Sequence, residues 1–231
     1  MVVIKGLEKS SLIDYPGKIS AVVFLAGCNF RCPFCHNRDL VLNPEGMESI
    51  PENEILDFLG ERKKWLDGVV VTGGEPTIHK ELPEFLKKLK GLGYPVKLDT
   101  NGSSPEMLKG LIEKDLVDYI AMDLKAPLEK YEKSSGVKVE TENIRESIKL
   151  IIGSGIGHEF RSTVLPGLHT KEDVQEMARL VKGASKLYLQ QFRPKNTLDP
   201  AFEGMKSFSE KEMLELRDRC REYVETEVRM A

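Results

Sequence analysis

Three of the four cysteines in the chain, Cys28, Cys32 and Cys35, form a C-x3-C-x2-C pattern directly after a predicted strand. Clustered cysteines are typical of metal or redox chemistry, whereas a disulfide framework spreads its cysteines along the chain. A cubane cluster has four irons, so three thiolates leave one iron without a protein ligand. That iron could bind the amino and carboxylate groups of a substrate. The pattern therefore favours an open [4Fe–4S] cluster.

Three other interpretations compete for these cysteines. The run from Cys32 to His36 has the C-x-x-C-H form of covalent haem attachment, which usually belongs to exported proteins and gives Cys28 no role. A zinc site could add His36 to the three cysteines, although adjacent Cys35 and His36 reach one tetrahedral centre with difficulty. A thioredoxin-like C-x-x-C pair also leaves Cys28 unused.

The remaining cysteine has a different setting. Cys220 shares a predicted helix face with Met213, Leu216 and Val224. This spacing predicts a buried structural thiol.

Polar side chains follow the later predicted strands. Gly73, Gly74 and Glu75 come after the second strand, where glycines allow a close approach of the backbone to a ligand and Glu75 could accept from an ammonium group. A plain glycine-rich turn is the alternative for the two glycines. Asp99 and Asn101 come after the third strand, where Asn101 and the glycine after it also fit an ordinary turn.

Three more charged residues lie on the next two strands. Asp123 and Lys125 interrupt an apolar run at the end of the fourth strand, where a simple ion pair is the alternative. Arg161, near the start of the fifth strand, could extend to the surface or meet a carboxylate with its planar guanidinium. Together these residues predict binding groups for a ligand that is both an amine and a carboxylate.

Six short, mostly apolar segments separated by amphipathic helical patterns predict the elements that position these residues. The predicted strands are 21–25, 69–72, 96–100, 119–124, 160–165 and 187–192. Six strand–helix units in a row predict an α/β fold with parallel strands, an open, partial (β/α)6 barrel of the TIM type, with its chemistry at the carboxyl ends of the strands.

One domain is expected over residues 1–231. Within it we expect an N-terminal extension over about 1–19, a cluster loop over 26–50 and a C-terminal helix over about 209–225. Ser209 and Glu212 have the spacing of a capping box at the start of that helix. Pro16 and Gly17 predict a turn with proline at its second position.

The net charge of −3 and the pI near 5.9 argue against broad, non-specific binding of nucleic acid. No apolar run approaches the roughly eighteen residues that a membrane-spanning helix needs. No signal peptide is expected from the N-terminal residues, so the predicted location is the cytoplasm.

In combination, these motifs resemble the radical S-adenosylmethionine (SAM) superfamily. The resemblance rests on the three cysteines after the first strand, Gly-Gly-Glu-Pro after the second and the six-unit partial barrel. The motifs Cys35-His36-Asn37, Asp99-Thr100-Asn101 and Asp123-Leu124-Lys125 resemble glycyl-radical-enzyme activating proteins. Most specifically, residues 11–18 and 121–127 resemble the activating proteins of anaerobic ribonucleoside-triphosphate reductase.

The resemblance implies a role for each candidate residue. It implies a [4Fe–4S] cluster on Cys28, Cys32 and Cys35, and SAM as the second cofactor. It places the backbone of Phe34 by the adenine and Glu75 at the SAM amino group, with Gly73 and Gly74 as further residues of the SAM site. Lys125 and Arg161 become candidates for the SAM carboxylate or ribose, and Asn101 is a further candidate for binding SAM. Asp99 and Asp123 are expected to face the same site, around a monovalent cation.

The resemblance also implies a reaction and partners. A reduced cluster would cleave SAM to a 5′-deoxyadenosyl radical, with no acid or base needed from the protein. That radical would take a hydrogen atom from a glycine of anaerobic ribonucleotide reductase, and a ferredoxin or flavodoxin would supply electrons. Two alternatives stay open: a radical SAM enzyme modifying a small molecule, peptide or tRNA, and a non-catalytic iron–sulfur electron carrier.

The chain departs from some of these relatives. Activators of pyruvate formate-lyase carry Asp-Gly-Pro-Gly followed by Ile-Arg. At the corresponding place this chain has Asp14-Tyr15-Pro16-Gly17-Lys18-Ile19. Their sixth strand offers a histidine near SAM, where this chain has Gln190 and Gln191. With four cysteines in total, the chain has no room for the additional ferredoxin-type clusters of other activators.

Overall fold

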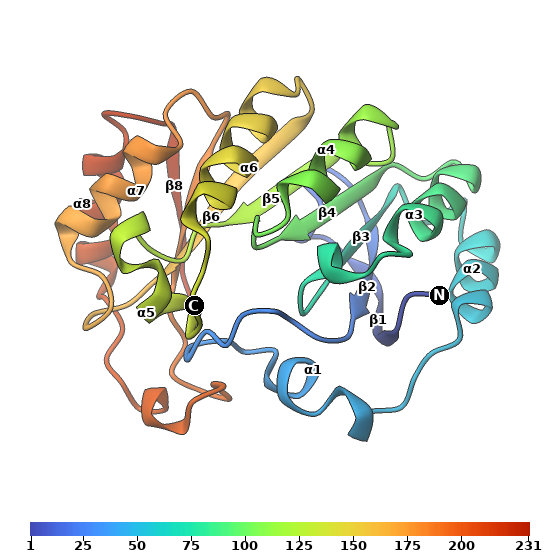
Figure 1. Ribbon diagram of the computed structural model, residues 1–231, viewed down its shortest axis with the longest axis horizontal. Helices are drawn as coiled ribbons and strands as arrows, with labels where there is room; N and C mark the ends of the chain where they lie inside the picture. The colour runs from blue at the N-terminus through green and yellow to red at the C-terminus, as the bar shows by residue number, and fades with distance from the viewer. The chain divides into compact units, whose positions relative to one another are not determined.

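The computed structural model describes residues 1–231, and strands alternate with helices along most of the chain (Figure 1). The strands follow chain order in an eight-stranded sheet. They are β1 (Ile4–Ser11), β2 (Ser20–Leu25), β3 (Gly68–Gly73), β4 (Val96–Thr100), β5 (Tyr119–Asp123), β6 (Gly157–Val164), β7 (Leu187–Gln191) and β8 (Thr226–Arg229).

The chain forms two compact units, which we describe separately. Unit 1 comprises Met1–Asn29, Asp39–Thr100 and Glu106–Ile120, and unit 2 comprises Phe30–Arg38, Asn101–Pro105 and Ala121–Ala231. The expectation of one domain over 1–231 stays a prediction.

In unit 1, β2, β3 and β4 are parallel, and β1 pairs antiparallel with β2. The segments between these strands are helical because their apolar residues recur at the spacing of one helix face. They are α1 (Arg38–Leu42), α2 (Glu52–Glu61), α3 (Leu82–Gly91) and α4 (Pro105–Glu113), with short 3₁₀ turns at Pro44–Gly46 and Pro76–Ile78. Helices α1 and α4 each begin one residue outside the unit. Strand β3 is buried along nearly its whole length, as expected of a parallel strand covered on both faces.

The predicted turn at Pro16 is confirmed. The Lys18 N–H donates to the Tyr15 carbonyl at 3.1 Å, and Gly17 has φ of 71°. Glycine suits this position because the turn requires a positive φ there.

In unit 2, β6, β7 and β8 are parallel. The helical segments are α5 (Tyr131–Ser135), α6 (Thr141–Gly153), α7 (Lys171–Leu180) and α8 (Glu210–Cys220), with 3₁₀ turns at Leu128–Lys130 and Pro200–Phe202. Helices α7 and α8 lie side by side (Figure 1), joined by the ion pair of Lys171 with Glu215 at 2.6 Å.

All six predicted strands are present as β2 to β7, with ends shifted by no more than three residues. The capping box of Ser209 and Glu212 is confirmed at the start of α8. That helix ends at Cys220 rather than near 225, because the chain turns there into β8. Strands β1 and β8 were not predicted.

No helix combines the length and the apolar composition that a membrane crossing requires.

Candidate active site

In unit 1, Cys28 follows β2 on a segment held by backbone hydrogen bonds. The Ala26 N–H donates to the Val3 carbonyl at 2.9 Å, and the Gly27 N–H donates to the Leu40 carbonyl at 2.8 Å. The Cys28 side chain is half-buried, and its thiol is not in a disulfide. The first cysteine of the cluster motif therefore has a fixed main chain.

Gly73 and Gly74 pack against this same segment. The Gly74 N–H donates to the Leu25 carbonyl at 2.9 Å, and the Glu75 N–H donates to the Gly27 carbonyl at 2.8 Å. A Cβ on Gly74 would lie 1.7 Å from the Gly27 oxygen, and one on Gly73, whose φ is 122°, would lie 2.3 Å from the Leu25 oxygen. The two glycines therefore let β3 approach the chain that leads to Cys28, a contact not anticipated from the sequence.

We expect Gly74→Ala to destabilise the protein because the backbone around Gly27 must move to admit the methyl group. Overpacking of this kind costs about 1–3 kcal/mol, measured as the free energy of unfolding. Gly110→Ala in α4 is the matched control, because nothing lies within 4 Å of the position that its Cβ would take. The control should be as stable as the wild type or more so, by up to about 1 kcal/mol, since alanine favours helix over glycine. Equal stability of both variants would contradict the packing account.

The Glu75 carboxylate is 1% exposed and fixed by hydroxyl and amide donors. Its Oε1 accepts from the Thr77 N–H at 3.1 Å, the Thr77 hydroxyl at 2.5 Å and the Thr100 hydroxyl at 2.8 Å. Because Thr100 ends β4, the carboxylate joins the ends of two neighbouring strands. These three donors fix the orientation of the carboxylate.

Asp99, also at the end of β4, forms an ion pair with Lys97. The Lys97 side chain is fully buried, and Asp99 is nearly so. The two residues are two positions apart on one strand, so their side chains lie on the same face.

Cys32 and Cys35 belong to unit 2, in a turn closed by the Cys35 N–H and the Cys32 carbonyl at 3.0 Å. The loop after β7 holds this turn through main-chain hydrogen bonds. The Leu198 N–H donates to the Cys35 carbonyl at 2.9 Å, and the Asp199 N–H donates to the Pro33 carbonyl at 2.9 Å. Both thiols are outside disulfides.

Aromatic contacts fix the side chains next to Cys35. The buried Phe34 ring meets His169 edge-on, with centroids 6.5 Å apart. The His36 ring stacks on Phe192 at 6.0 Å, and its Nε2 donates to the Arg193 carbonyl at 2.8 Å. The Nε2 nitrogen of His36 is therefore already engaged by the protein.

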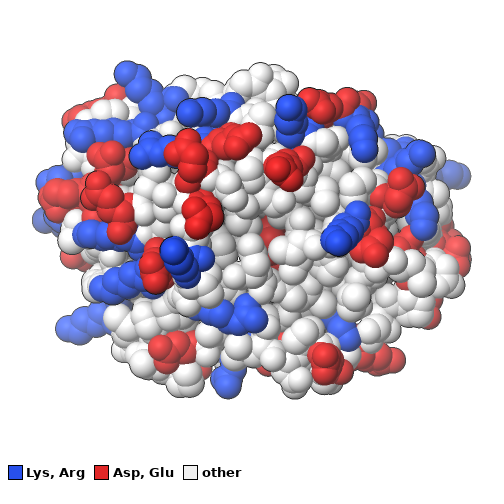
Figure 2. All heavy atoms as spheres, in the orientation of Figure 1, with Lys and Arg blue, Asp and Glu red and all other residues white.

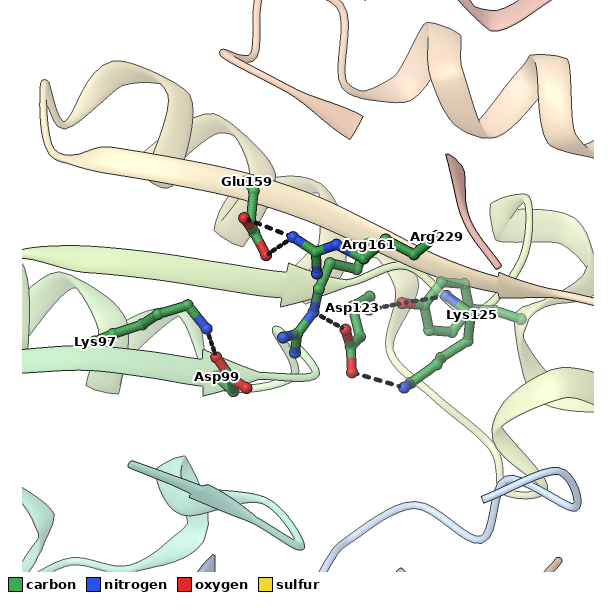
Figure 3. Close-up of polar contacts among 8 residues, drawn as sticks. Lys97, Asp99, Asp123, Lys125, Glu159, Arg161 and Arg229 are labelled. Carbon is green, nitrogen blue, oxygen red and sulfur yellow. Dashed lines mark hydrogen bonds and ion pairs between the residues drawn. The ribbon is translucent and has the colours of Figure 1, made fainter. Parts of the chain in front are cut away.

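In unit 2, Asp123, Lys125 and Arg161 form one ionic cluster (Figure 3). Arg161 Nε donates to Asp123 Oδ1 at 2.8 Å, and Lys125 Nζ donates to Asp123 Oδ2 at 3.2 Å. Burial raises the pKa of the Asp123 carboxyl, but the two cations outweigh it and hold that pKa well below its ordinary value. The ion pair considered as an alternative at this position is therefore present.

Lys125 also interacts electrostatically with the two cysteines of unit 2. Burial lowers the pKa of the Lys125 ammonium, but Asp123, Cys32 and Cys35 outweigh it and hold that pKa above its ordinary value. The Lys125 ammonium therefore stays charged beside the Cys32–Cys35 turn.

Two aromatic residues hold the main chain of Lys125. The Tyr131 hydroxyl accepts from the Lys125 N–H at 3.4 Å. His169 Nε2 donates to the Lys125 carbonyl at 2.8 Å, while its Nδ1 accepts from the Leu165 N–H at 3.3 Å. Burial lowers the pKa of His169, so the neutral ring that this pattern needs is favoured.

Asn101 lies in a turn, as in the alternative to ligand binding that its sequence allowed. Its Oδ1 accepts from the Ser103 N–H at 2.9 Å, and the Gly102 carbonyl accepts from the Ser147 hydroxyl at 2.7 Å. Ser147 is on α6, so the turn is tied to that helix.

The structure thus brings the predicted residues together in groups. In unit 1, the Cys28 segment contacts Gly73, Gly74 and Glu75; in unit 2, Asp123 joins Lys125 and Arg161. Sequence reasoning did not single out the supporting residues, which are Thr77, Lys97, Thr100, Tyr131 and His169. Lys97 had a usable signal, because a lysine inside an apolar strand segment must find a partner.

Cys220 is fully buried, and its thiol donates to the Val174 carbonyl at 3.6 Å. Burial raises the pKa of this thiol to about 12. It is therefore the inert structural thiol that its helix face predicts.

Comparison with known proteins identifies the family. Residues 22–181 match the Radical SAM superfamily. A Methanocaldococcus jannaschii protein provisionally named as a glycyl-radical enzyme activating enzyme is 36% identical over 97% of this chain and 94% of its own length. The pyruvate formate-lyase-activating enzyme of Clostridium pasteurianum is 28% identical over 84% of this chain and 82% of its own.

Solved structures agree on the fold. A domain of pyruvate-formate lyase-activating enzyme from Bacteroides vulgatus has a TM-score of 0.58 at 18% identity, covering 70% of this chain and 98% of that one. Streptococcus suis SuiB has a TM-score of 0.67 at 15% identity, covering 88% of this chain, which spans about half of SuiB (47%). The predicted α/β fold, a partial (β/α)6 barrel with parallel strands, is confirmed.

The match over residues 22–181 and the full-length relative together show that the chain belongs to the radical SAM superfamily and, within it, to the glycyl-radical enzyme activating enzymes, whose cofactors are a [4Fe–4S] cluster and SAM.

Proposed function

We propose that Cys28, Cys32 and Cys35 ligate the cluster and that Glu75 binds the amino group of SAM. The observation that carries this proposal is the contact of the Glu75 segment with the Cys28 segment, through the Glu75 N–H and the Gly27 carbonyl at 2.8 Å. It holds a thiol and a buried carboxylate on adjacent pieces of chain. The donor set fits the group: three thiols outside disulfides leave one iron open to the amine and carboxylate of SAM.

The other contacts with SAM are proposed residue by residue. Phe34 faces the adenine through its backbone, and Gly73 and Gly74 keep the Glu75 segment close. Lys125 and Arg161 offer cations for the SAM carboxylate or ribose, and each is already oriented by Asp123. Asp99 and Asn101 supply polar groups from the end of β4 and the turn after it.

A reduced cluster held by Cys28, Cys32 and Cys35 would supply the one electron needed to cleave SAM into methionine and a 5′-deoxyadenosyl radical. The residues of this chain bind and orient rather than transfer protons. Asp123 is kept ionised by its two cations, and Lys125 is kept protonated, so neither is poised to exchange a proton near neutral pH. Because the chain belongs to a family of enzymes, we no longer consider the alternative that it is a non-catalytic iron–sulfur electron carrier.

The proposed partner is a glycyl-radical protein, specifically anaerobic ribonucleoside-triphosphate reductase. Support for the general class comes from the two relatives named as activating enzymes. Support for the specific partner comes from residues 11–18 and 121–127, whose sequences resemble the activators of that reductase. Charges of both signs are interspersed on the face shown in Figure 2, which favours a protein partner over nucleic acid.

Three further features belong to the proposal. A ferredoxin or flavodoxin supplies the electron, and the protein works in the cytoplasm, where a reducing environment protects free thiols. Both units belong to one radical SAM domain, which is supported by a family match that runs through residues of each unit.

The partner assignment is tested by anaerobic incubation of the reconstituted protein with SAM, reductant and a purified anaerobic ribonucleotide reductase. The expected result is the electron paramagnetic resonance signal of a glycyl radical on the reductase. A reductase with its radical glycine replaced by alanine is the control and should give no signal. SAM cleavage without any glycyl signal on the wild-type reductase would contradict this partner while leaving the family intact.

A further inference from the structure

Lys97, the second residue of β4, is a fully buried lysine. A buried ammonium is costly unless a charged partner compensates it. Its partner is the Asp99 carboxylate, on the same face of the strand (Figure 3). The mechanism proposed above gives Lys97 no task, so its burial calls for a separate explanation.

The strand position limits what Lys97 can do. It pairs in register with Val70 of β3, and Leu98 beside it pairs with Val71. With no exposure on its side chain, the ammonium cannot be exchanged for water without moving the strand. It is therefore a fixed positive charge next to Asp99.

Asp123, in unit 2, is neutralised in the same way. Arg161 approaches one carboxylate oxygen at 2.8 Å and Lys125 approaches the other at 3.2 Å (Figure 3). Each of the two aspartates at which a monovalent cation was expected therefore carries at least one cationic side chain.

This arrangement does not fit an additional inorganic cation. Sodium and potassium ions bind through oxygen ligands, and an ion on Asp99 would share its carboxylate with an ammonium of the same charge. Like charges at such short range repel strongly where water is excluded.

We propose that Lys97 supplies, as a built-in ammonium, the positive charge that a monovalent cation would supply at Asp99, and that it positions this carboxylate for SAM. The proposal rests on the SAM-binding role of Asp99 proposed above. Lys97 is a positioning residue and does not touch the reacting atoms. It follows that the protein works equally well without sodium or potassium ions.

The first test uses the wild-type holoprotein. Its SAM affinity, measured by equilibrium dialysis, should be the same in potassium chloride and in tetramethylammonium chloride, whose ion is too large for a carboxylate site. The melting temperature of the apoprotein should also be the same in both salts. A loss of SAM affinity of about tenfold or more in tetramethylammonium would overturn the proposal.

The second test uses Lys97→Ala, which opens space beside Asp99. In tetramethylammonium the variant should bind SAM about tenfold more weakly than the wild type, the loss expected for one charged contact. Potassium or sodium ions should restore both the affinity and the melting temperature. A purely structural lysine would give a variant that neither ion rescues, and that result would overturn the proposal.

The double variant K97A/D99N separates the two proposals. Without the carboxylate, its melting temperature should not respond to potassium ions, and a response equal to that of Lys97→Ala would place the ion elsewhere and overturn the inference. Unchanged SAM affinity in Asp99→Asn would contradict the role of Asp99 in SAM binding, and with it the claim that Lys97 positions Asp99 for SAM. The response of the Lys97→Ala apoprotein to potassium ions would still decide whether the Lys97 ammonium replaces an ion. Should Lys97→Ala not fold, the wild-type comparison alone can still contradict the proposal.

Discussion

Replacing Cys28, Cys32 or Cys35 by alanine is expected to remove the iron–sulfur cluster and abolish SAM cleavage. Each thiolate is proposed to hold one iron, and the loop offers no spare cysteine to replace it. Two features limit rearrangement: the main chain before Cys28 is fixed by β3, and the Cys32–Cys35 turn is fixed by the loop after β7. Iron and sulfide content should fall together with the yield of 5′-deoxyadenosine.

Cys220→Ala is the matched control for these variants. Its thiol is fully buried on α8 and bonded to Val174, so it should lose about 1 kcal/mol of stability while keeping the cluster and activity. A variant of any of the three loop cysteines with full activity would contradict the ligand assignment. Loss of the cluster in Cys220→Ala would do so as well.

Glu75→Ala is expected to weaken SAM binding by about 10- to 100-fold, the range for one hydrogen bond to a charged group. The cluster should remain, because Glu75 is not one of its ligands and its backbone contact with Gly27 does not depend on the side chain. Equilibrium dialysis of SAM against the loaded protein measures the affinity, and iron analysis checks the cluster.

Two further variants separate binding from stability. Glu75→Gln keeps a carbonyl oxygen that accepts from Thr77 and Thr100, so this variant should be as stable as the wild type. Because it lacks the charge, its SAM affinity should be reduced as in Glu75→Ala. Glu52→Ala removes another buried carboxylate, paired with Lys88 on the helices of unit 1, and should leave SAM affinity unchanged. Wild-type affinity in Glu75→Gln would show that its charge does not hold the SAM amino group.

The parallel strands could be predicted from the sequence because burial on both faces makes them short, continuous apolar runs, such as residues 69–71 of β3. Strands β1 and β8 could not, because they lack that signal. β1 carries Lys5, Glu8 and Lys9 among its eight residues, and β8 has a single valine among four. Strands β1 and β8 form because they pair with β2 and β7, and such pairing cannot be read from the local sequence of either strand.

The chemical groups of the site could be predicted from residue type and spacing, since cysteine clusters and charged residues at strand ends are unusual in themselves. Their supports could not be. Thr100 holds Glu75 across 25 positions of sequence, and His169 holds the Lys125 carbonyl across 44. The glycine pattern suggests room for a ligand at Gly74, whereas the neighbour of Gly74 is the backbone of Gly27. Such contacts depend on which strands become neighbours.

The most direct test of the central claim is anaerobic. The protein is reconstituted with iron and sulfide, given SAM and dithionite, and the 5′-deoxyadenosine formed is quantified by mass spectrometry. The account predicts 5′-deoxyadenosine and methionine in equal amounts, dependent on all three loop cysteines. A protein loaded with iron and sulfide that neither binds SAM nor forms this product would contradict it.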